Sequence, residues 1–144
     1  MLLTKVMLVD DEVPFVETLT KRLSKRDLRV CSAFSGREAL EKLKKDSSVD
    51  VVMLDVKMPG MDGIETLREI KESHPLVEVI MLTGHATIET AIEGMKLGAF
   101  DYLMKPCDIE QLMVKVEEAK DKKRKHEEKI MEARLQEITL RHGG

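Results

Sequence analysis

The chain has 144 residues, of which 42% are hydrophobic and 3% aromatic, so there is room for one domain with an aliphatic core and a short appendage. Its net charge is −3, and because the segment from Lys120 onward carries eight Lys and Arg against five Asp and Glu, the remaining body is acidic and unsuited to generic nucleic-acid binding. The start lacks the basic and apolar stretches of a signal peptide, and no apolar run reaches the roughly 18 residues of a membrane span, so we expect a cytoplasmic protein. The two cysteines lack metal-ligand spacing and are expected to be reduced thiols.

Apolar runs alternate with helical patterns five times along the chain. The runs are residues 6–9, 29–33, 51–54, 79–82 and 100–104. The first, third and fourth are apolar at nearly every position, which is typical of strands that are covered on both faces. The second is more polar and the fifth contains Asp101, so these two are predicted to be edge strands. Strand–helix alternation at this spacing predicts right-handed crossovers and a parallel sheet.

Start signals precede the predicted helices. Capping boxes are predicted at Ser35–Glu38, Asp62–Glu65 and Asp108–Gln111, Pro14 suits the first turn of the first helix, and residues 59–63 form a turn cluster. In the first helix the predicted buried stripe is Phe15, Val16, Leu19 and Leu23. A fourth helix is predicted over about Thr87–Leu97, ended by Gly98, with Ile88, Ala91, Ile92 and Met95 buried.

The last predicted helix is unusually long, because neither Gly nor Pro occurs from Asp108 to about Leu140. Its apolar heptad seam becomes polar at Lys123 and His126, so a clean coiled coil is not specified, although residues 130–140 could pair weakly. The basic run at residues 120–125 is interpreted as a solvated helix face. We therefore predict a domain over residues 1–120 and a helical extension or linker over residues 121–144.

Four side chains stand at the ends of apolar runs: Asp10, Asp55, Thr83 and Lys105. If those runs are parallel strands of one sheet, all four emerge at its carboxyl edge, which is where open α/β sheets bind ligands. Carboxylates, one hydroxyl and one ammonium group suit a divalent metal together with a phosphoryl group. Asp10 and its neighbour Asp11 could alternatively be a polar turn that merely caps the first helix. That alternative does not explain the polar residues at the other three strand ends.

Asp10, Asp11 and Asp55 are the candidate metal ligands. Carboxylates crowded together repel one another, so at least one pKa should rise unless a cation binds. A small site with oxygen ligands suits Mg²⁺, with Mn²⁺ as a substitute, and the backbone carbonyl of Lys57 could complete the coordination. Asp55 is also the candidate nucleophile, because a carboxylate can attack phosphorus to form an acyl phosphate.

The other candidates would assist that transfer. Lys105 would supply a second cation for the charge on the phosphoryl oxygens, and Thr83 could donate its hydroxyl to one of them. The peptide bond before Pro106 can be cis, which would fix the direction of the lysine. Tyr102, the single tyrosine, is by position alone a half-exposed ring on an edge strand.

These residues fall in motifs that resemble the receiver, or phosphoacceptor, domain of two-component response regulators. The motifs are VDDE at 9–12, LDVKMPGMDG at 54–63, LTGH at 82–85 and GAFDYLMKP at 98–106. In this order and spacing they are highly specific, and the resemblance covers about residues 4–119. The chain is similar in particular to the receivers of enhancer-binding transcription activators.

The resemblance implies a flavodoxin-like (βα)5 doubly wound parallel sheet of order 2-1-3-4-5, here with an extended C-terminal helix. It implies transfer from the phosphohistidine of a sensor histidine kinase, or from a phosphotransfer protein, to Asp55, with Mg²⁺ at Asp10, Asp11 and Asp55. Thr83 and Tyr102 would then move and remodel the surface of the fourth helix, fifth strand and fifth helix. Such a domain is a signalling module and catalyses only its own phosphorylation and dephosphorylation.

The resemblance leaves the output open. The partner could be a downstream protein, an output domain or a second copy that pairs on phosphorylation. One reading is a stand-alone regulator, and the other is the receiver portion of a truncated DNA-binding activator; whether the encoded chain continues past Gly144 separates them. Lys57 and His85 occupy positions where the family varies, and these should influence the lifetime of the phosphorylated state.

Two other protein classes fit less well. A haloacid-dehalogenase-type phosphatase would need an acid at position 57, two residues past the nucleophile, and Lys57 stands there. A flavodoxin would offer hydroxyls and amides to a flavin phosphate in its first loop, whereas this loop is acidic and would repel phosphate without a metal.

Overall fold

The computed structural model describes residues 3–58, 62–84 and 87–142. Within them, five strands alternate with five helices. In chain order the elements are β1 (Lys5–Val9), α1 (Val13–Ser24), β2 (Arg29–Ala33), α2 (Gly36–Lys45), β3 (Val51–Leu54), α3 (Gly63–Ser73), β4 (Glu78–Thr83), α4 (Ile88–Lys96), β5 (Asp101–Met104) and α5 (Ile109–His142). The strands coincide with the five apolar runs to within a residue at each end.

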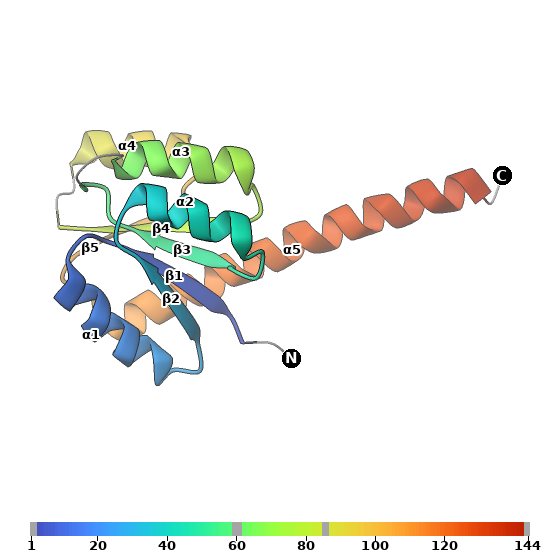
Figure 1. Cartoon of the computed structure of the whole chain (residues 1–144). Coiled ribbons are helices and arrows are strands. Elements are labelled where there is room, and N and C mark those ends of the chain that lie inside the picture. Colours follow the sequence, from blue (N-terminus) through green and yellow to red (C-terminus); the bar gives the residue numbers. More distant parts are fainter. Residues whose placement is uncertain (1–2, 59–61, 85–86, 143–144) are drawn as a thin grey trace.

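All strand pairs are parallel, and the strand order is β2-β1-β3-β4-β5. The helices α2, α3 and α4 cover one face of the sheet, and α1 and α5 cover the other (Figure 1). The central strands β1, β3 and β4 are buried on both faces, which is why their sequences are apolar at almost every position. The predicted doubly wound sheet and both predicted edge strands are confirmed.

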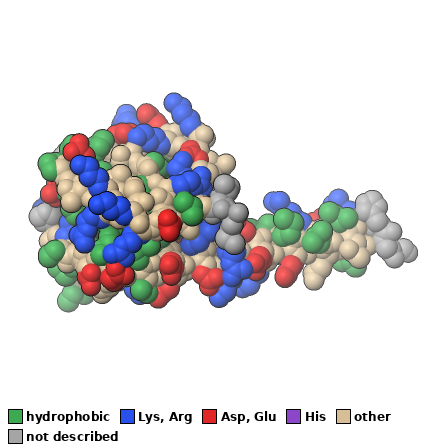
Figure 2. All heavy atoms as spheres, turned by 90° about the horizontal axis from the view of Figure 1, so that it is seen from below, with side chains coloured by type: hydrophobic (Ala, Val, Ile, Leu, Met, Phe, Trp, Pro, Cys, Tyr) green, Lys and Arg blue, Asp and Glu red, His purple; other side chains and the backbone are tan. Residues whose placement is uncertain are grey.

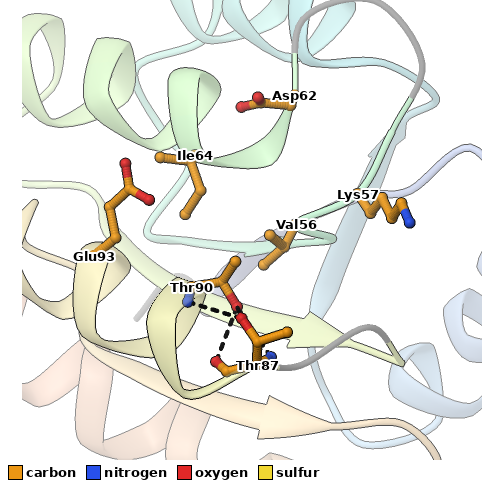
Figure 3. A pocket seen from close by; sticks show the side chains of 7 residues that line it. All are labelled: Val56, Lys57, Asp62, Ile64, Thr87, Thr90 and Glu93. Carbon is orange, nitrogen blue, oxygen red and sulfur yellow. Dashed lines mark hydrogen bonds between the residues drawn. The ribbon is translucent and has the colours of Figure 1, made fainter.

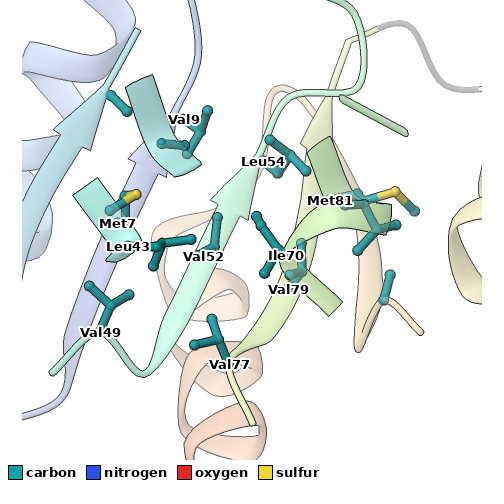
Figure 4. Packing of buried hydrophobic residues seen from close by; sticks show 14 of the residues in the cluster. Met7, Val9, Leu43, Val49, Val52, Leu54, Ile70, Val77, Val79 and Met81 are labelled. Atoms are coloured by element: carbon teal, nitrogen blue, oxygen red, sulfur yellow. The ribbon is translucent and has the colours of Figure 1, made fainter. Parts of the chain in front are cut away.

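Alternate side chains of the central strands form two cores. On the α2–α3–α4 face, side chains of β1, β3 and β4 pack against Leu43 of α2 and Ile70 of α3 (Figure 4). On the opposite face they pack against the buried stripe of α1, in which Val16, Leu19 and Leu23 are buried as predicted and Phe15 is partly buried. The first part of α5 completes this second core.

The caps predicted at Ser35 and Asp62 are present, whereas Asp108 accepts from the Glu110 amide at 3.2 Å, one residue before the Gln111 amide that a capping box uses. The side chain of Ser35 accepts a hydrogen bond from the Glu38 amide at 3.1 Å, and Asp62 accepts one from the Glu65 amide at 2.8 Å. The Glu38 carboxylate returns to the amide of Phe34, one residue before the expected partner. Gly98 follows α4 with φ +103°, a left-handed conformation that ends a helix and favours glycine.

The predicted buried face of α4 is wrong. Ile88, Ile92 and Met95 are 80, 50 and 46% exposed, Ala91 is only partly buried, and Gly94 is the buried residue of the helix. A Cβ at Gly94 would lie 2.1 Å from Cε of Met81, so the helix rests on β4 at its glycine. The apolar stripe therefore faces solvent.

The helix α5 has two parts. Leu112, Val116 and Ala119 are buried in the second core, whereas residues 124–141 are exposed and project beyond the sheet (Figure 1). We call residues 124–142 the α5 extension. The interpretation of the basic run as a solvated face is wrong for Lys123, which is 8% exposed and ion-paired with the body of the protein.

Hydrophobic side chains lie along the exposed surface of the extension (Figure 2). They do not make it a membrane segment: among the described residues, no helix is both long enough and apolar enough to cross a bilayer.

Candidate functional site

The carboxyl ends of β1, β3, β4 and β5 bring the four predicted side chains to one edge of the sheet. Asp10 and Asp55 directly follow β1 and β3, and the Asp55 amide donates to the carbonyl of Val9 at 2.9 Å. Thr83 ends β4, and its carbonyl accepts from the Lys105 amide at 3.0 Å just past β5. Backbone hydrogen bonds thus hold these segments in place before any ligand binds.

Asp10, Asp11 and Asp55 form an acidic cluster in which one carboxylate oxygen from each lies within 4.8 Å of the others. Asp10 and Asp55 are each 3% exposed, whereas Asp11 is exposed and opens the cluster to solvent. Three anionic oxygen donors converging from two strand ends are the ligands that Mg²⁺ prefers, and the exposed side leaves room for the waters it retains. The residues present therefore fit a small divalent cation.

Lys105 lies at the same edge. Its Nζ is 2.5 Å from Oδ2 of Asp10, 3.4 Å from Oε1 of Glu12 and 4.0 Å from Oδ2 of Asp55. It also lies 4.1 Å from the ring centroid of Phe15, a cation–π contact. The lysine is therefore a positioned cation beside the cluster and not a solvated surface residue.

Burial raises the pKa of Asp10, against the lowering effect of its hydrogen bonds from Lys105 and the Glu12 amide. The charge of Asp55 also raises it. Burial by itself would lower the pKa of Lys105, but hydrogen bonding and attraction to Asp10 raise it, so the ammonium stays charged. These opposing effects follow from burying two carboxylates and an ammonium group beside one another.

The remaining predicted residues surround the cluster. Lys57 is exposed, and its amide lies 3.4 Å from Oδ1 of Asp55. Thr83 is fully buried. Tyr102 is half-buried and packs against the α2–α3–α4 core. The peptide bond between Lys105 and Pro106 is cis.

Three neighbours of the site escaped the sequence reasoning as site residues. Glu12 and Phe15 contact the Lys105 ammonium, as described above. Gly63 begins α3 directly over the Asp55 backbone: a Cβ there would lie 2.3 Å from the Asp55 carbonyl oxygen, and the Gly63 amide donates to the carbonyl of Val56 at 2.8 Å. A glycine immediately after the capping Asp62 was the available signal.

A cavity of about 590 Å³ opens between the loop after β3, the start of α3 and the start of α4 (Figure 3). Its lining residues are Val56, Lys57, Asp62, Ile64, Thr87, Thr90 and Glu93. On one wall Thr87 and Thr90 exchange hydrogen bonds that cap α4. Because Val56 and Lys57 directly follow Asp55, this hollow borders the acidic cluster.

The predicted turn at Pro59–Met61 and the predicted lifetime-setting residue His85 lie outside the described residues.

Comparison with known proteins places this fold in one class. The chain matches the response regulator receiver domain over residues 6–117, about three quarters of its length. It belongs to this family, a signalling domain of two-component systems that switches on phosphorylation.

Curated relatives include the transcriptional regulatory protein ZraR of Escherichia coli, which is 40% identical over 79% of this chain and 26% of ZraR. The DNA-binding transcriptional regulator NtrC of the same organism is 39% identical over 79% of this chain and 24% of NtrC. The chain thus spans about a quarter of the length of these relatives.

Solved structures of receiver domains have the same fold as this chain. A response regulator receiver domain protein of Clostridium thermocellum is 37% identical with a TM-score of 0.81, covering 85% of this chain and 98% of that one. NtrX of Brucella abortus is 31% identical with a TM-score of 0.81, covering 88% of this chain and 29% of that one. The likeness therefore extends both to isolated receivers and to a receiver within a longer protein.

Proposed function

We propose that Asp55 accepts a phosphoryl group from the phosphohistidine of a sensor kinase or phosphotransfer protein in the cytoplasm. The observation that carries this proposal is the convergence of Asp10, Asp11, Asp55 and Lys105 at one sheet edge. The three carboxylates cap none of the described helices, and together they can bind a cation beside a phosphoryl group.

The transfer needs little from the protein beyond position and charge. One carboxylate oxygen of Asp55 forms a bond to phosphorus while the phosphorus–nitrogen bond of the phosphohistidine breaks, and the imidazole leaves with the electron pair and takes up a proton. The ammonium of Lys105, 4.0 Å from Asp55, stabilises the negative charge on the phosphoryl oxygens. Hydrolysis of the acyl phosphate by water later returns the free carboxylate.

Asp10, Asp11 and Asp55 would hold Mg²⁺, with the backbone carbonyl of Lys57 as a further ligand. When bound, the ion supplies positive charge to the transferring oxygens and offsets the repulsion among the carboxylates. Mn²⁺ offers the same oxygen preference and would substitute.

The switch follows from how little of Asp55 is exposed. A phosphoryl group attached to a carboxylate that is 3% exposed must displace or attract its neighbours. Thr83 and Lys105 are the adjacent donors, and Tyr102 packs half-buried behind them on β5. We infer that movement of Thr83 toward the phosphoryl group lets the Tyr102 ring turn inward, which shifts the population toward an active state.

The output surface would be the one formed by α4, β5 and α5. It already exposes apolar side chains, namely Ile88, Ile92 and Met95 of α4 and Met104 of β5. An exposed apolar group next to a switching helix suits contact with a downstream protein, or with a second copy after phosphorylation.

A second candidate is that this receiver forms part of a longer transcription activator. The observation that favours it is the 40% identity to ZraR, confined to about a quarter of that protein. The chemistry at Asp55 would be the same, and the output domain rather than a separate protein would read the switch.

The deciding experiment is labelling with a small phosphodonor, such as acetyl phosphate, in the presence of Mg²⁺. The unchanged protein is expected to take up one phosphoryl group and Asp55→Asn none. Asp121→Asn, which removes a partly exposed acid from α5, is the matched control and should label normally. Equal labelling of Asp55→Asn would reject the assignment.

A further inference from the structure

Two buried acids lie at the opposite edge of the sheet from the acidic cluster. Asp50 immediately precedes β3 and is 4% exposed, and Glu78 begins β4 and is 1% exposed. An ionised carboxylate removed from water is costly unless cations or hydrogen-bond donors surround it. The phosphorylation chemistry uses neither acid, so their partners indicate a different role.

Asp50 is held from both sides. Its Oδ1 accepts from Nζ of Lys120 and from Nζ of Lys123, each at 2.9 Å, and its Oδ2 accepts from the Lys5 amide at 2.9 Å. Burial alone would raise the pKa of Asp50, but these three hydrogen bonds together lower it. The acid is therefore ionised and bound to two ammonium groups of α5.

Glu78 contacts a third lysine of the same helix. Nζ of Lys122 lies 3.5 Å from its Oε2, and Nζ of Lys71, from α3, lies 3.6 Å from its Oε1. Nζ of Lys122 also lies 5.7 Å from the centroid of the Phe100 ring. Lysines of α3 and α5 thus flank one buried carboxylate, each nearest a different oxygen and at ion-pair distance.

These lysines occupy the last turn of α5 that touches the body. Ala119 is fully buried and Lys123 is 8% exposed, whereas every described side chain from Arg124 to Arg141 is exposed. Successive residues of an α-helix point about 100° apart, so Lys122 and Lys123 reach two different acids from two directions. Contacts from two directions oppose rotation of the helix about its axis as well as tilting.

We propose that Asp50 and Glu78 form an acidic socket that grips Lys120, Lys122 and Lys123 and so fixes the direction and rotational setting of the α5 extension. The extension carries Met131, Leu135 and Ile138 along one side, and the socket determines where that side faces. This positioning role is independent of phosphorylation and would serve whichever protein or domain the extension contacts.

The test measures how well the extension is held. Spin labels are placed at Ser73→Cys on the body and Arg134→Cys on the extension, in a background where Cys31 and Cys107 are replaced by serine, and the protein is diluted with unlabelled chains. Pulsed electron–electron resonance is expected to give a narrow distance distribution. In Lys120→Gln/Lys123→Gln the narrow distribution is lost, and amide exchange over residues 124–134 accelerates roughly tenfold.

Lys125→Gln is the matched control. It removes the same charge from the same helix, but Lys125 is exposed, and within the described part of the chain its ion-pair partner is Asp121 of α5 itself. It should keep the narrow distribution. If the double variant also keeps it, with unchanged amide exchange, the socket does not position the extension and the proposal is wrong.

Two further variants separate this inference from the others. Asp50→Asn should broaden the distribution as the lysine variants do; should it fail to fold, the lysine variants still decide, because they leave Asp50 and its hydrogen bond from the Lys5 amide in place. Asp55→Asn should keep the narrow distribution. A broadened distribution in Asp55→Asn would contradict the claim that the socket acts independently of the phosphorylation site.

Discussion

Lys105 donates to Asp10, with 2.5 Å between Nζ and Oδ2. The same ammonium group lies 4.0 Å from the nearer oxygen of Asp55. It is therefore held by a carboxylate of the proposed metal site and stands within reach of the proposed phosphoacceptor. A phosphoryl group adds negative charge at Asp55 and would compete for this cation.

The first prediction follows from that contact. Lys105→Ala removes a cation that competes for Asp10, so we expect Mg²⁺ to bind at least as tightly as in the unchanged protein, while the phosphorylated form fails to switch. Calorimetry measures the affinity, and the fluorescence of Tyr102, the single tyrosine, follows the switch. Lys25→Ala, which removes an exposed lysine at the end of α1, is the control for loss of charge. An affinity roughly tenfold weaker in Lys105→Ala would show instead that the lysine organises the cluster.

The second prediction concerns Gly63. A Cβ at this position meets the Asp55 carbonyl oxygen at 2.3 Å, and backbone atoms cannot move aside cheaply. We expect Gly63→Ala to destabilise the fold by about 2 kcal/mol and to slow phosphoryl uptake, as measured by urea unfolding and labelling. Gly94→Ala is the comparison, because there the new Cβ meets the flexible end of Met81 and, at 3.7 Å, Cδ2 of Leu67, but no backbone atom closer than these. Equal effects of the two substitutions would contradict this account.

The third prediction tests the outward face of α4. Ile88 and Ile92 are largely exposed, so Ile88→Gln/Ile92→Gln should change the free energy of unfolding by less than about 1 kcal/mol in total. Ile70→Ala, which empties a fully buried position, should cost about 3 kcal/mol. Urea unfolding distinguishes the two. A large loss from the α4 variant would mean that this face is buried in solution.

The fourth prediction is a pH dependence. The folded protein lowers the pKa of Asp50 below its ordinary 3.8, so the ionised group stabilises the fold above that value, and the contribution is lost as pH falls through the folded pKa. Asp50→Asn should therefore cost about 2 kcal/mol near neutral pH and much less once the pH has fallen below the folded pKa of Asp50.

Urea unfolding at several pH values measures this difference. Glu117→Gln, on the exposed side of α5, should change stability little at any of them. A cost for Asp50→Asn that stays constant with pH would show that the ionised form of Asp50 is not what stabilises the fold.

Much of this architecture was predictable because buried parallel strands leave a simple signal. The runs ending at Val9, Leu54 and Leu82 are apolar throughout, since both faces of the sheet are covered, and the polar residues that follow them must meet at one edge. The gathering of Asp10, Asp11, Asp55 and Lys105 at that edge followed from topology alone, whereas their chemical roles remain predictions.

The face of α4 was not predictable from its periodicity. Ile88, Ile92 and Met95 form a regular apolar stripe, but a stripe does not reveal whether the sheet or solvent lies beneath it. What decides is the close approach at Gly94, where Met81 fills the space that a side chain would occupy. The glycine inside the helix indicated the side that packs on the sheet, although a single glycine is a less regular signal than an apolar stripe.

For Lys123 of α5 the error was the reverse: a residue predicted to be exposed is buried. Lys123 interrupts an apolar seam and looks solvated, yet it is buried because Asp50 precedes a strand that lies far away in the sequence. Pairing of charges across 73 residues leaves no local pattern, so only the fold could reveal it.

The exposed length of α5 gives small motions a large reach. At about 1.5 Å of rise per residue, His142 lies roughly 28 Å beyond Lys123, and a rotation of about ten degrees at the base would carry the tip through about 5 Å. Angstrom-scale movements within the globular part would thus become larger displacements at a distant contact, as long as the contacts of Lys120, Lys122 and Lys123 hold the base of the extension.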